Sequence, residues 1–341
     1  MGFPEDSSHF QHWIFTEQQL DIQRRSVLEA AVQKLTVQLE EKGVSPPADL
    51  FLDKNECEFL ISYFVSQLLI VCSVKGLDYK VTNTAAAFLT RFYLKRSLFE
   101  FDPRRILLTC ILLSIKSEDL AMSTTLHRFC ESLISPKRVR LAEVIDNELV
   151  VLDAISFHLL VLQPRTPIHF LTTEYFQRYK PTKPSETASA EEKQAVHEAQ
   201  TAFGKLLEEI KRDAEQLALQ AFGNAEIPFL YTPSQIGIAT FLHVSEGKLQ
   251  DAEKFVGGLF NASDDKARLF DSLRPKLLDL RTRLALMVEE RQQEGDEERS
   301  QRAAKGIKKL EKLAKLLKGG RVPTETPSSP KETETSLPEQ H

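Results

Sequence analysis

The sequence predicts an all-α protein, and three observations support that prediction. Apolar residues recur at spacings of three, four and seven over almost the whole chain, whereas the strict alternation typical of a strand is nearly absent. Capping-box residue pairs, which satisfy free backbone N–H groups at helix starts, precede several of these stretches. The chain has 341 residues, 42% of them hydrophobic, so it is long enough for about two domains.

The first helix is expected to begin at Thr16, with Gln19 as its capping-box partner, and to end at Gly43. It carries an apolar stripe along one side, which must be covered by another element. The stripe consists of Leu20, Val27, Leu28, Ala31, Leu35 and Leu39.

A five-helix unit is expected after the Ser45-Pro46-Pro47 break. Its first helix is preceded by the capping pair Asp53 and Glu56. Its third helix begins at Asp102 and is apolar almost all round, which is typical of a helix in the centre of a bundle. The other three are expected over 81–95, 123–133 and 138–155.

The second half of the chain predicts another helical bundle. Residues 181–191 are rich in Pro, Ser, Thr and Glu, which predicts a mobile loop. Helices are expected over 192–221 and over 264–291. Between them, another helix is expected to start at a capping box formed by Thr232 and Gln235. We expect the apolar stripe of the last helix to dock on the N-terminal helix.

The C-terminal end of the chain divides by charge. Residues 305–321 hold seven Lys and Arg residues against the single acidic Glu311 and predict a basic amphipathic helix. A solvated face is the commonest explanation, and a nuclear import signal, an assembly-factor contact and an RNA-contacting patch are the alternatives. Residues 322–341 have too few large apolar residues to fold, which predicts a disordered tail. Thr326 and Ser329 each precede a proline there, as sites of proline-directed kinases do.

Composition and motifs argue against several classes of protein. The N-terminus does not read as a secretory signal, and the longest strongly apolar run, 106–115, is too short to cross a bilayer. The net charge of -5 argues against a dedicated nucleic-acid binder, although not against local basic patches. Four cysteines without a C-x-x-C pair predict buried reduced thiols. No phosphate-binding glycine loop, nucleophile elbow or H-E-x-x-H motif occurs, so we expect no enzyme, metal or cofactor.

Four segments, in order, resemble the cyclin family and within it the cyclin H group. The run TRFYLKRSLFEFDPRRILLTCILLSIKSEDL at 90–120 resembles the cyclin box. HWIFTEQQL at 12–20, NELVVLDAISFHLLV at 147–161 and LYTPSQIGIA at 230–239 agree with the N-terminal helix, the last box helix and the second repeat.

The resemblance implies two tandem five-helix cyclin folds with extra N- and C-terminal helices that pack together. The expected division is an N-terminal helix in 1–48, a first cyclin box in 49–161, a second cyclin fold in 162–262, C-terminal helices in 263–321 and the tail in 322–341.

The resemblance also implies a function. In cyclins a Lys and a Glu of the first box grip the kinase around its regulatory helix, and the matching residues here are Lys116 of SIKSED and Glu148. It implies a non-catalytic regulatory subunit of the CDK-activating kinase, whose partners are the kinase catalytic subunit, an assembly factor and general transcription factor IIH. The substrates would be activation loops of cyclin-dependent kinases and the RNA polymerase II C-terminal repeats. The resemblance therefore implies a nuclear protein that could also occur in the cytoplasm. We expect it to bind neither membranes nor specific DNA sequences.

Three other interpretations remain open. The chain could be a transcriptional cyclin of the C or K type, although HWIF and YTPSQ favour cyclin H. A promoter-binding protein similar to transcription factor IIB is disfavoured by the acidic net charge, and a helical scaffold without a kinase is disfavoured by Lys116 and Glu148. Substrate docking as in cell-cycle cyclins is not expected, because the matching region reads ISYFVSQLL and the only Trp, Trp13, lies outside the box.

Overall fold

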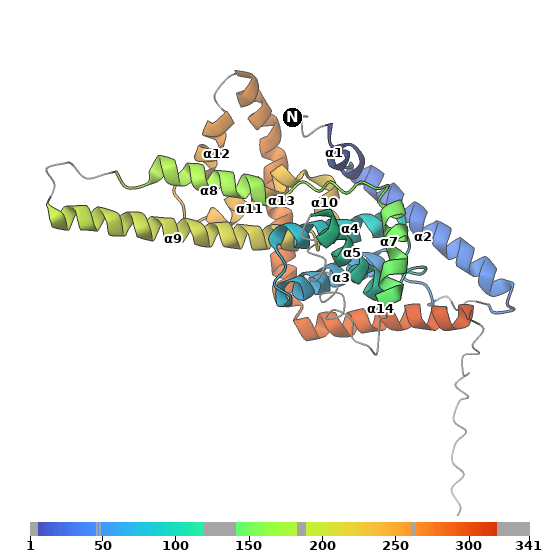
Figure 1. Cartoon of the computed structure of the whole chain (residues 1–341). Helices are drawn as coiled ribbons and strands as arrows, with labels where there is room; N and C mark the ends of the chain where they lie inside the picture. Colours follow the sequence, from blue (N-terminus) through green and yellow to red (C-terminus); the bar gives the residue numbers. More distant parts are fainter. Residues whose placement is uncertain are drawn as a thin grey trace, which may run out of the picture.

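The computed structural model describes residues 6–45, 47, 49–118, 141–182, 189–260 and 264–318. Regular secondary structure in these ranges is helical, as the sequence predicts. Figure 1 shows two groups of helices side by side, with α2 along the outside of one group and α9 projecting from the other. The tail predicted for 322–341 and the helix predicted for 123–133 lie outside the described residues.

Two helices precede the first group, α1 (Ser8–Trp13) and α2 (Glu17–Glu40). The predicted capping box starts α2, because the Thr16 hydroxyl accepts from the Gln19 N–H and the Gln19 side chain accepts from the Thr16 N–H. Gly43 follows the helix in a turn with a φ of 70°, a conformation that glycine adopts at little cost. The start of this helix was therefore predicted correctly from local sequence.

The first group consists of α3 (Lys54–Val74), α4 (Tyr79–Lys95), α5 (Pro103–Ser117) and α7 (Leu141–Ala154). Asp53 and Glu56 form the predicted capping box of α3, and Asp102 caps α5. The apolar helix α5 is buried along most of its length, as its composition predicts. The neighbouring α4 is buried on all sides as well, which its polar residues conceal in the sequence.

By length and composition, α3 is the one described helix that could cross a membrane. In the fold it supplies Leu60, Phe64, Val65 and Leu68 to the core that α4 and α5 share. The same composition therefore suits a core helix.

The second group follows in the order α8 (Arg165–Tyr179), α9 (Ala190–Ala221), α10 (Ile227–Leu230), α11 (Pro233–Ser245), α12 (Ala252–Phe260) and α13 (Asp264–Gln293). The loop expected over 181–191 is too long at its C-terminal end. Ser189 caps α9 and Glu192 completes a capping box, so the helix already begins at Ala190. Residues 183–188 lie outside the described residues.

The expected docking of the 264–291 helix on the N-terminal helix is wrong. The α13 stripe of Leu277, Leu280 and Leu284 lies in the second core, where α13 packs against α11 and α12. Because α11 is apolar on nearly all sides, it offers α13 a larger apolar surface than α2 does.

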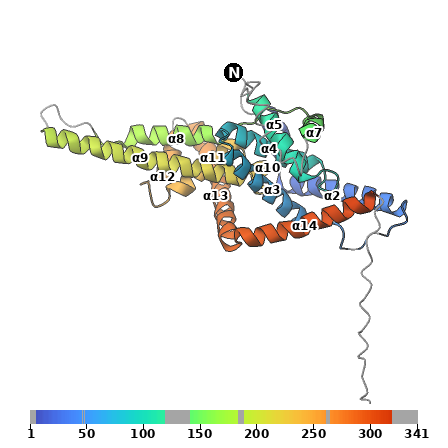
Figure 2. The same cartoon turned by 60° about the horizontal axis from the view of Figure 1, so that its bottom comes forward.

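The last helix, α14 (Asp296–Leu317), covers the N-terminal helix instead. Leu313 and Leu316 pack with Leu35 and Leu39 of α2 in a small third core. Figure 2 shows α14 crossing the outside of the first group, from the end of α13 to the end of α2. The N- and C-terminal helices thus pack together, as the resemblance implies.

Candidate functional site

The two kinase-binding residues predicted from the sequence lie together at the surface of the first group. Lys116 is in the last turn of α5, where a cation is favoured by the helix dipole, and Glu148 is in α7. The Lys116 Nζ lies 2.8 and 2.7 Å from the two carboxylate oxygens of Glu148. The two side chains remain 37% and 21% exposed, so a partner can reach them.

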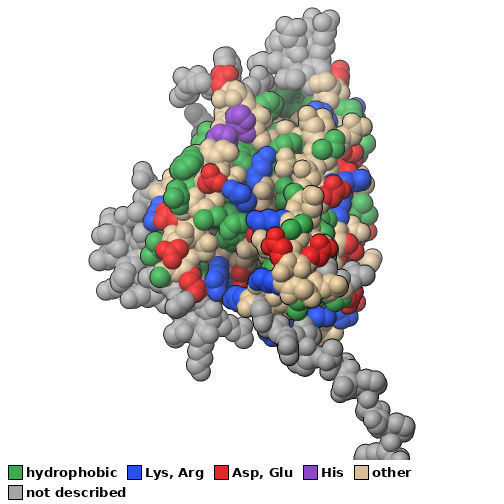
Figure 3. All heavy atoms as spheres, turned by 90° about the vertical axis from the view of Figure 1, so that its right-hand side faces the viewer, with side chains coloured by type: hydrophobic (Ala, Val, Ile, Leu, Met, Phe, Trp, Pro, Cys, Tyr) green, Lys and Arg blue, Asp and Glu red, His purple; other side chains and the backbone are tan. Residues whose placement is uncertain are grey.

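Large apolar side chains are exposed beside this ion pair. Ile145 and Leu149, four residues apart, are exposed on one side of α7, and Ile145 lies three residues before Glu148. Phe157 and Leu160 are exposed in the segment that follows α7. Figure 3 shows the side of the molecule that carries α2 and α7, with hydrophobic side chains exposed among charged ones. Exposed apolar side chains that form a contiguous patch mark interaction sites.

Glu118 fixes the end of α5 that carries Lys116. Its carboxylate accepts a hydrogen bond from the Thr84 hydroxyl at 2.6 Å and pairs with Lys80 at 2.5 Å, both from the first turns of α4. The side chain is only 9% exposed, so this contact is well shielded from solvent. Glu118 lies within the SIKSED segment, but no sequence pattern indicated its role.

The N-terminal helix α1 docks beside the segment after α7. Trp13 is buried, and the Arg91 guanidinium lies 4.9 Å from the centre of its ring. Arg91 Nη1 also donates to the His158 carbonyl at 3.2 Å, and the His12 ring stacks on the His158 ring at 4.5 Å. Burial lowers the pKa of Arg91 to about 9. These contacts connect α1 and α4 to the turn that presents Phe157.

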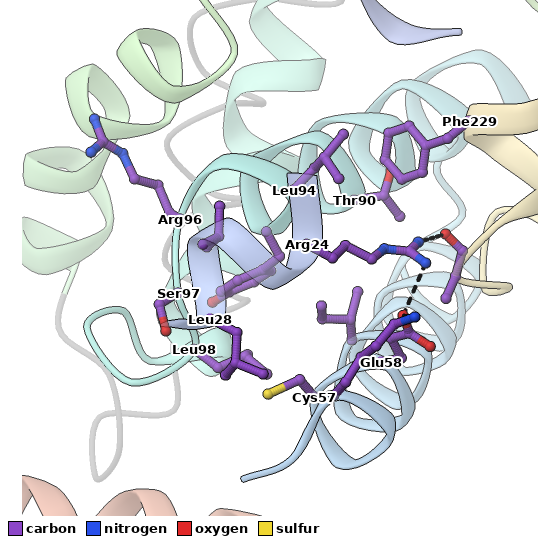
Figure 4. A pocket seen from close by; sticks show the side chains of 15 residues that line it. Arg24, Leu28, Cys57, Glu58, Thr90, Leu94, Arg96, Ser97, Leu98 and Phe229 are labelled. Carbon is purple, nitrogen blue, oxygen red and sulfur yellow. Dashed lines mark hydrogen bonds and ion pairs between the residues drawn. The ribbon is translucent and has the colours of Figure 1, made fainter. Parts of the chain in front are cut away.

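A small pocket lies between α2, α3, α4 and the turn before α10. Arg24 reaches across it, donating to Glu58 at 3.0 Å and to the Ala225 carbonyl (Figure 4). Cys57 lines the pocket, and burial with the nearby Asp53 carboxylate raises the pKa of its thiol to about 12. A thiol with so high a pKa is a poor nucleophile. The pocket lies where the N-terminal helix α2 meets both groups of helices, and we assign it no chemical role.

Metal chemistry finds no support in the part of the chain that the structure describes. No group of three or more His, Cys, Asp or Glu side chains there could hold a metal ion. Cys57, Cys72 and Cys110 are free thiols, and Cys130 lies outside the described ranges. Burial raises the pKa of Cys72 to about 12.

Comparisons with known proteins agree with this architecture. No family model matches the sequence. A probable cyclin-H of Echinococcus multilocularis is 25% identical over 272 residues, which cover 76% of this chain and 78% of the relative. Cyclin mcs2 of Schizosaccharomyces pombe is 30% identical over 171 residues, which cover 48% of this chain and 51% of that protein.

Solved structures share the fold across nearly the whole chain. A chain of the Chaetomium thermophilum CAK complex bound to ATP-gamma-S superposes with a TM-score of 0.70 at 20% identity, covering 96% of this chain and 97% of its own. A chain of the yeast TFIIK complex gives 0.55 at 20% identity, covering 82% and 99%. The helices of this chain are thus arranged as in those two chains. In sequence the chain is thus similar to proteins described as cyclin H or as related cyclins.

Proposed function

We propose that this chain is the regulatory cyclin subunit of a CDK-activating kinase. It binds the catalytic subunit and activates it, and it catalyses no reaction itself. Its cyclin H relatives and its structural similarity to chains of the CAK and TFIIK complexes support this assignment. Residues 49–161 would form the first cyclin box and 162–262 the second cyclin fold, and the two separate large cores are consistent with that division.

The observation that carries the proposal is the Lys116–Glu148 pair at the edge of exposed apolar surface. Apolar side chains such as Leu149 supply the buried area of an interface, while charged groups at its edge fix orientation and partner choice. A Lys donor and a Glu acceptor side by side can satisfy backbone carbonyl and N–H groups at the end of a partner helix. The arrangement therefore suits a helix of the kinase.

The bound helix is the regulatory helix of the kinase. Holding it inward brings its Glu to the Lys that positions ATP and opens the activation loop. The cyclin surface binds this active conformation of the kinase more tightly than the inactive one. The difference in binding free energy shifts the kinase from its inactive to its active conformation.

The wider assembly follows from the same family. With an assembly factor, the pair would phosphorylate the activation loops of other cyclin-dependent kinases. As part of transcription factor IIH, it would phosphorylate the RNA polymerase II C-terminal repeats, in the nucleus.

A charge swap tests the site. In the double variant Lys116→Glu with Glu148→Lys the two side chains can still pair with each other, so a purely structural role would be preserved. We expect the double variant to lose at least ~100-fold in affinity for the kinase catalytic subunit, about 3 kcal/mol, because both partner groups now meet the wrong charge. Helicity and melting temperature should remain those of the wild type.

The matched control is Lys248→Asp with Asp213→Lys, a similarly exposed pair in the second group, 3.4 Å apart. Kinase binding and stimulation should be unchanged in this variant. Wild-type kinase affinity in the Lys116 and Glu148 double variant would refute the site. Binding of another transcriptional kinase in place of the CDK-activating kinase would instead identify a cyclin C or K type.

A further inference from the structure

The outer face of α14 carries a stripe of lysines that the proposed function does not use. It consists of Lys305, Lys308, Lys312 and Lys315, all of them exposed. At 100° per residue the four side chains point within about 80° of one another, and at 1.5 Å per residue they span about 15 Å. They form one straight row of positive charge on a chain whose net charge is -5.

No ion pair with a described residue neutralises this stripe. The lysine that faces inward, Lys309, pairs with Glu56 at 2.7 Å. The acidic residue within the row, Glu311, pairs with Arg104 at 3.1 Å. The four outward lysines make no ion pair or hydrogen bond among the residues that the structure describes. Their charge is available to a partner.

The opposite side of α14 is buried against other helices, so the lysine stripe must face outward. Ala303, Gly306, Leu313 and Leu316 are buried, and α14 packs on α3 and α2. Figures 1 and 2 both show the helix at the edge of the molecule, with those helices on one side of it. The lysines are held outward on a docked helix.

The residue types on the outer face of α14 limit the class of molecule that could bind the lysine stripe. No large hydrophobic side chain is exposed on α14, whereas protein interfaces are usually anchored by buried aromatic or apolar residues. Single-stranded nucleic acid usually stacks on aromatic side chains, and α14 exposes none. Lysines without arginine act as point charges and do not read bases in the bidentate way. Duplex DNA agrees best with these observations, because its bases are stacked inside the helix and its phosphates are evenly spaced on the outside.

We propose that the outer face of α14 binds the phosphate backbone of duplex DNA without reading its sequence. A stretch of about 15 Å of duplex carries about nine phosphate charges, more than enough for four lysines. The contact is weak, salt-dependent and non-specific, so it agrees with the absence of sequence-specific DNA binding expected from the sequence. It stands independently of the kinase site.

Fluorescence anisotropy of a labelled 20-bp duplex of arbitrary sequence, titrated with the full chain, tests the proposal. With four phosphates neutralised, affinity should fall about 150-fold between about 50 and 200 mM salt. Changing all four lysines to Gln should weaken binding at about 50 mM by at least ~10-fold and remove most of the salt dependence.

The matched control changes the same charge elsewhere on the surface. Lys193, Lys205, Lys254 and Lys276 are all exposed, and their replacement by Gln should leave duplex binding within about threefold of wild type. Equal loss in both variants would show a net-charge effect and overturn the proposal, as would absence of binding at low salt. Tighter binding of a poly-glutamate peptide or of the matching single strand would overturn the choice of duplex. Circular dichroism of both variants should match wild type, since Gln is a good helix former.

Discussion

His9 is a buried titratable residue in the short helix α1. Its Nδ1 accepts a hydrogen bond from the Leu162 N–H at 3.0 Å, so the ring is neutral in the docked state. Burial and the nearby Arg91 charge lower its pKa from 6.5 to about 3. His12 and His158, stacked on each other, are the other titratable groups in this cluster. Burial and the nearby His12 and Arg91 also lower the pKa of His158.

Acid should therefore destabilise the chain through His9. Since the folded pKa lies below that of the unfolded chain, the unfolded state binds the proton more tightly at pH values between about 6.5 and 3. The contribution of His9 is complete above that window and is lost as the pH falls through it, about 2 kcal/mol at about pH 5. Urea unfolding followed by the fluorescence of Trp13, the only tryptophan, measures this loss.

The variant His9→Gln keeps a hydrogen-bond acceptor but no titratable group. Its loss of stability between about pH 8 and pH 5 should be smaller than that of wild type by about 2 kcal/mol. An identical pH dependence in the two proteins would show that His9 is protonated without cost. The comparison is between the two slopes, so any constant effect of the substitution cancels.

At the scale of single helices, Gly204 and Gly306 allow the effect of helix propensity to be distinguished from the effect of close packing. Gly204 lies within α9, and a Cβ there would meet only Phe176, at 3.8 Å. Gly306 lies within α14, and a Cβ there would come within 2.9 Å of the buried Leu60 side chain of α3. Glycine at 306 thus permits the close approach of two helices.

The same substitution should give different results at these two sites. Gly204→Ala should stabilise the chain by about 0.5 to 1 kcal/mol, because alanine is the better helix former. Gly306→Ala should gain nothing overall, since crowding of Leu60 offsets that benefit, and Gly306→Leu should cost about 1 to 3 kcal/mol. Thermal denaturation of the three variants measures these differences. Equal stabilisation by both alanines would show that α14 does not pack closely on α3.

The helices that sequence predicts best are those with signals in a few neighbouring residues. Capping boxes at Thr16, Asp53 and Thr232 lie where the sequence placed them. The burial of α4 was not predicted, because two of its threonine hydroxyl groups are satisfied by carbonyl groups of the preceding turn. Thr82 and Thr90 donate to the carbonyl groups of Asp78 and Ala86, so polar residues can lie in the core.

Contacts between distant segments required more than local patterns. The apolar stripe of α13 was correctly seen as a surface to be buried, but its partner depends on which neighbour offers the larger apolar face. Lys116 and Glu148, 32 residues apart, were singled out only through the resemblance to cyclins. Periodicity could not reveal that their side chains meet.

At the scale of the whole molecule, the C-terminal part of the chain divides into helix α14, which supports the core, and residues 322–341, whose composition predicts a disordered tail. Helix α14 places Leu313 and Leu316 on α2 and brings Ala303 to the first core, whereas residues 322–341 have too few large apolar residues to fold. Ending the chain after Lys318 should therefore change the melting temperature by less than about 2 °C and leave kinase activation intact. This shortened chain also lacks Thr326 and Ser329, so phosphorylation there would not be needed for activation.

Ending the chain before Asp296 removes α14 and should have the opposite effect. Leu35 and Leu39 of α2 and part of α3 lose their cover, which exposes contiguous apolar surface. We expect a fall in melting temperature of at least ~5 °C and increased binding of a hydrophobic dye, since several leucines worth about 1.5 to 3 kcal/mol each would be partly exposed. Calorimetry of the two shortened chains beside the full chain makes the comparison. If both behaved like the full chain, the packing of α14 on α2 would contribute nothing to stability, and a lysine stripe on a loosely held helix would no longer have a fixed geometry.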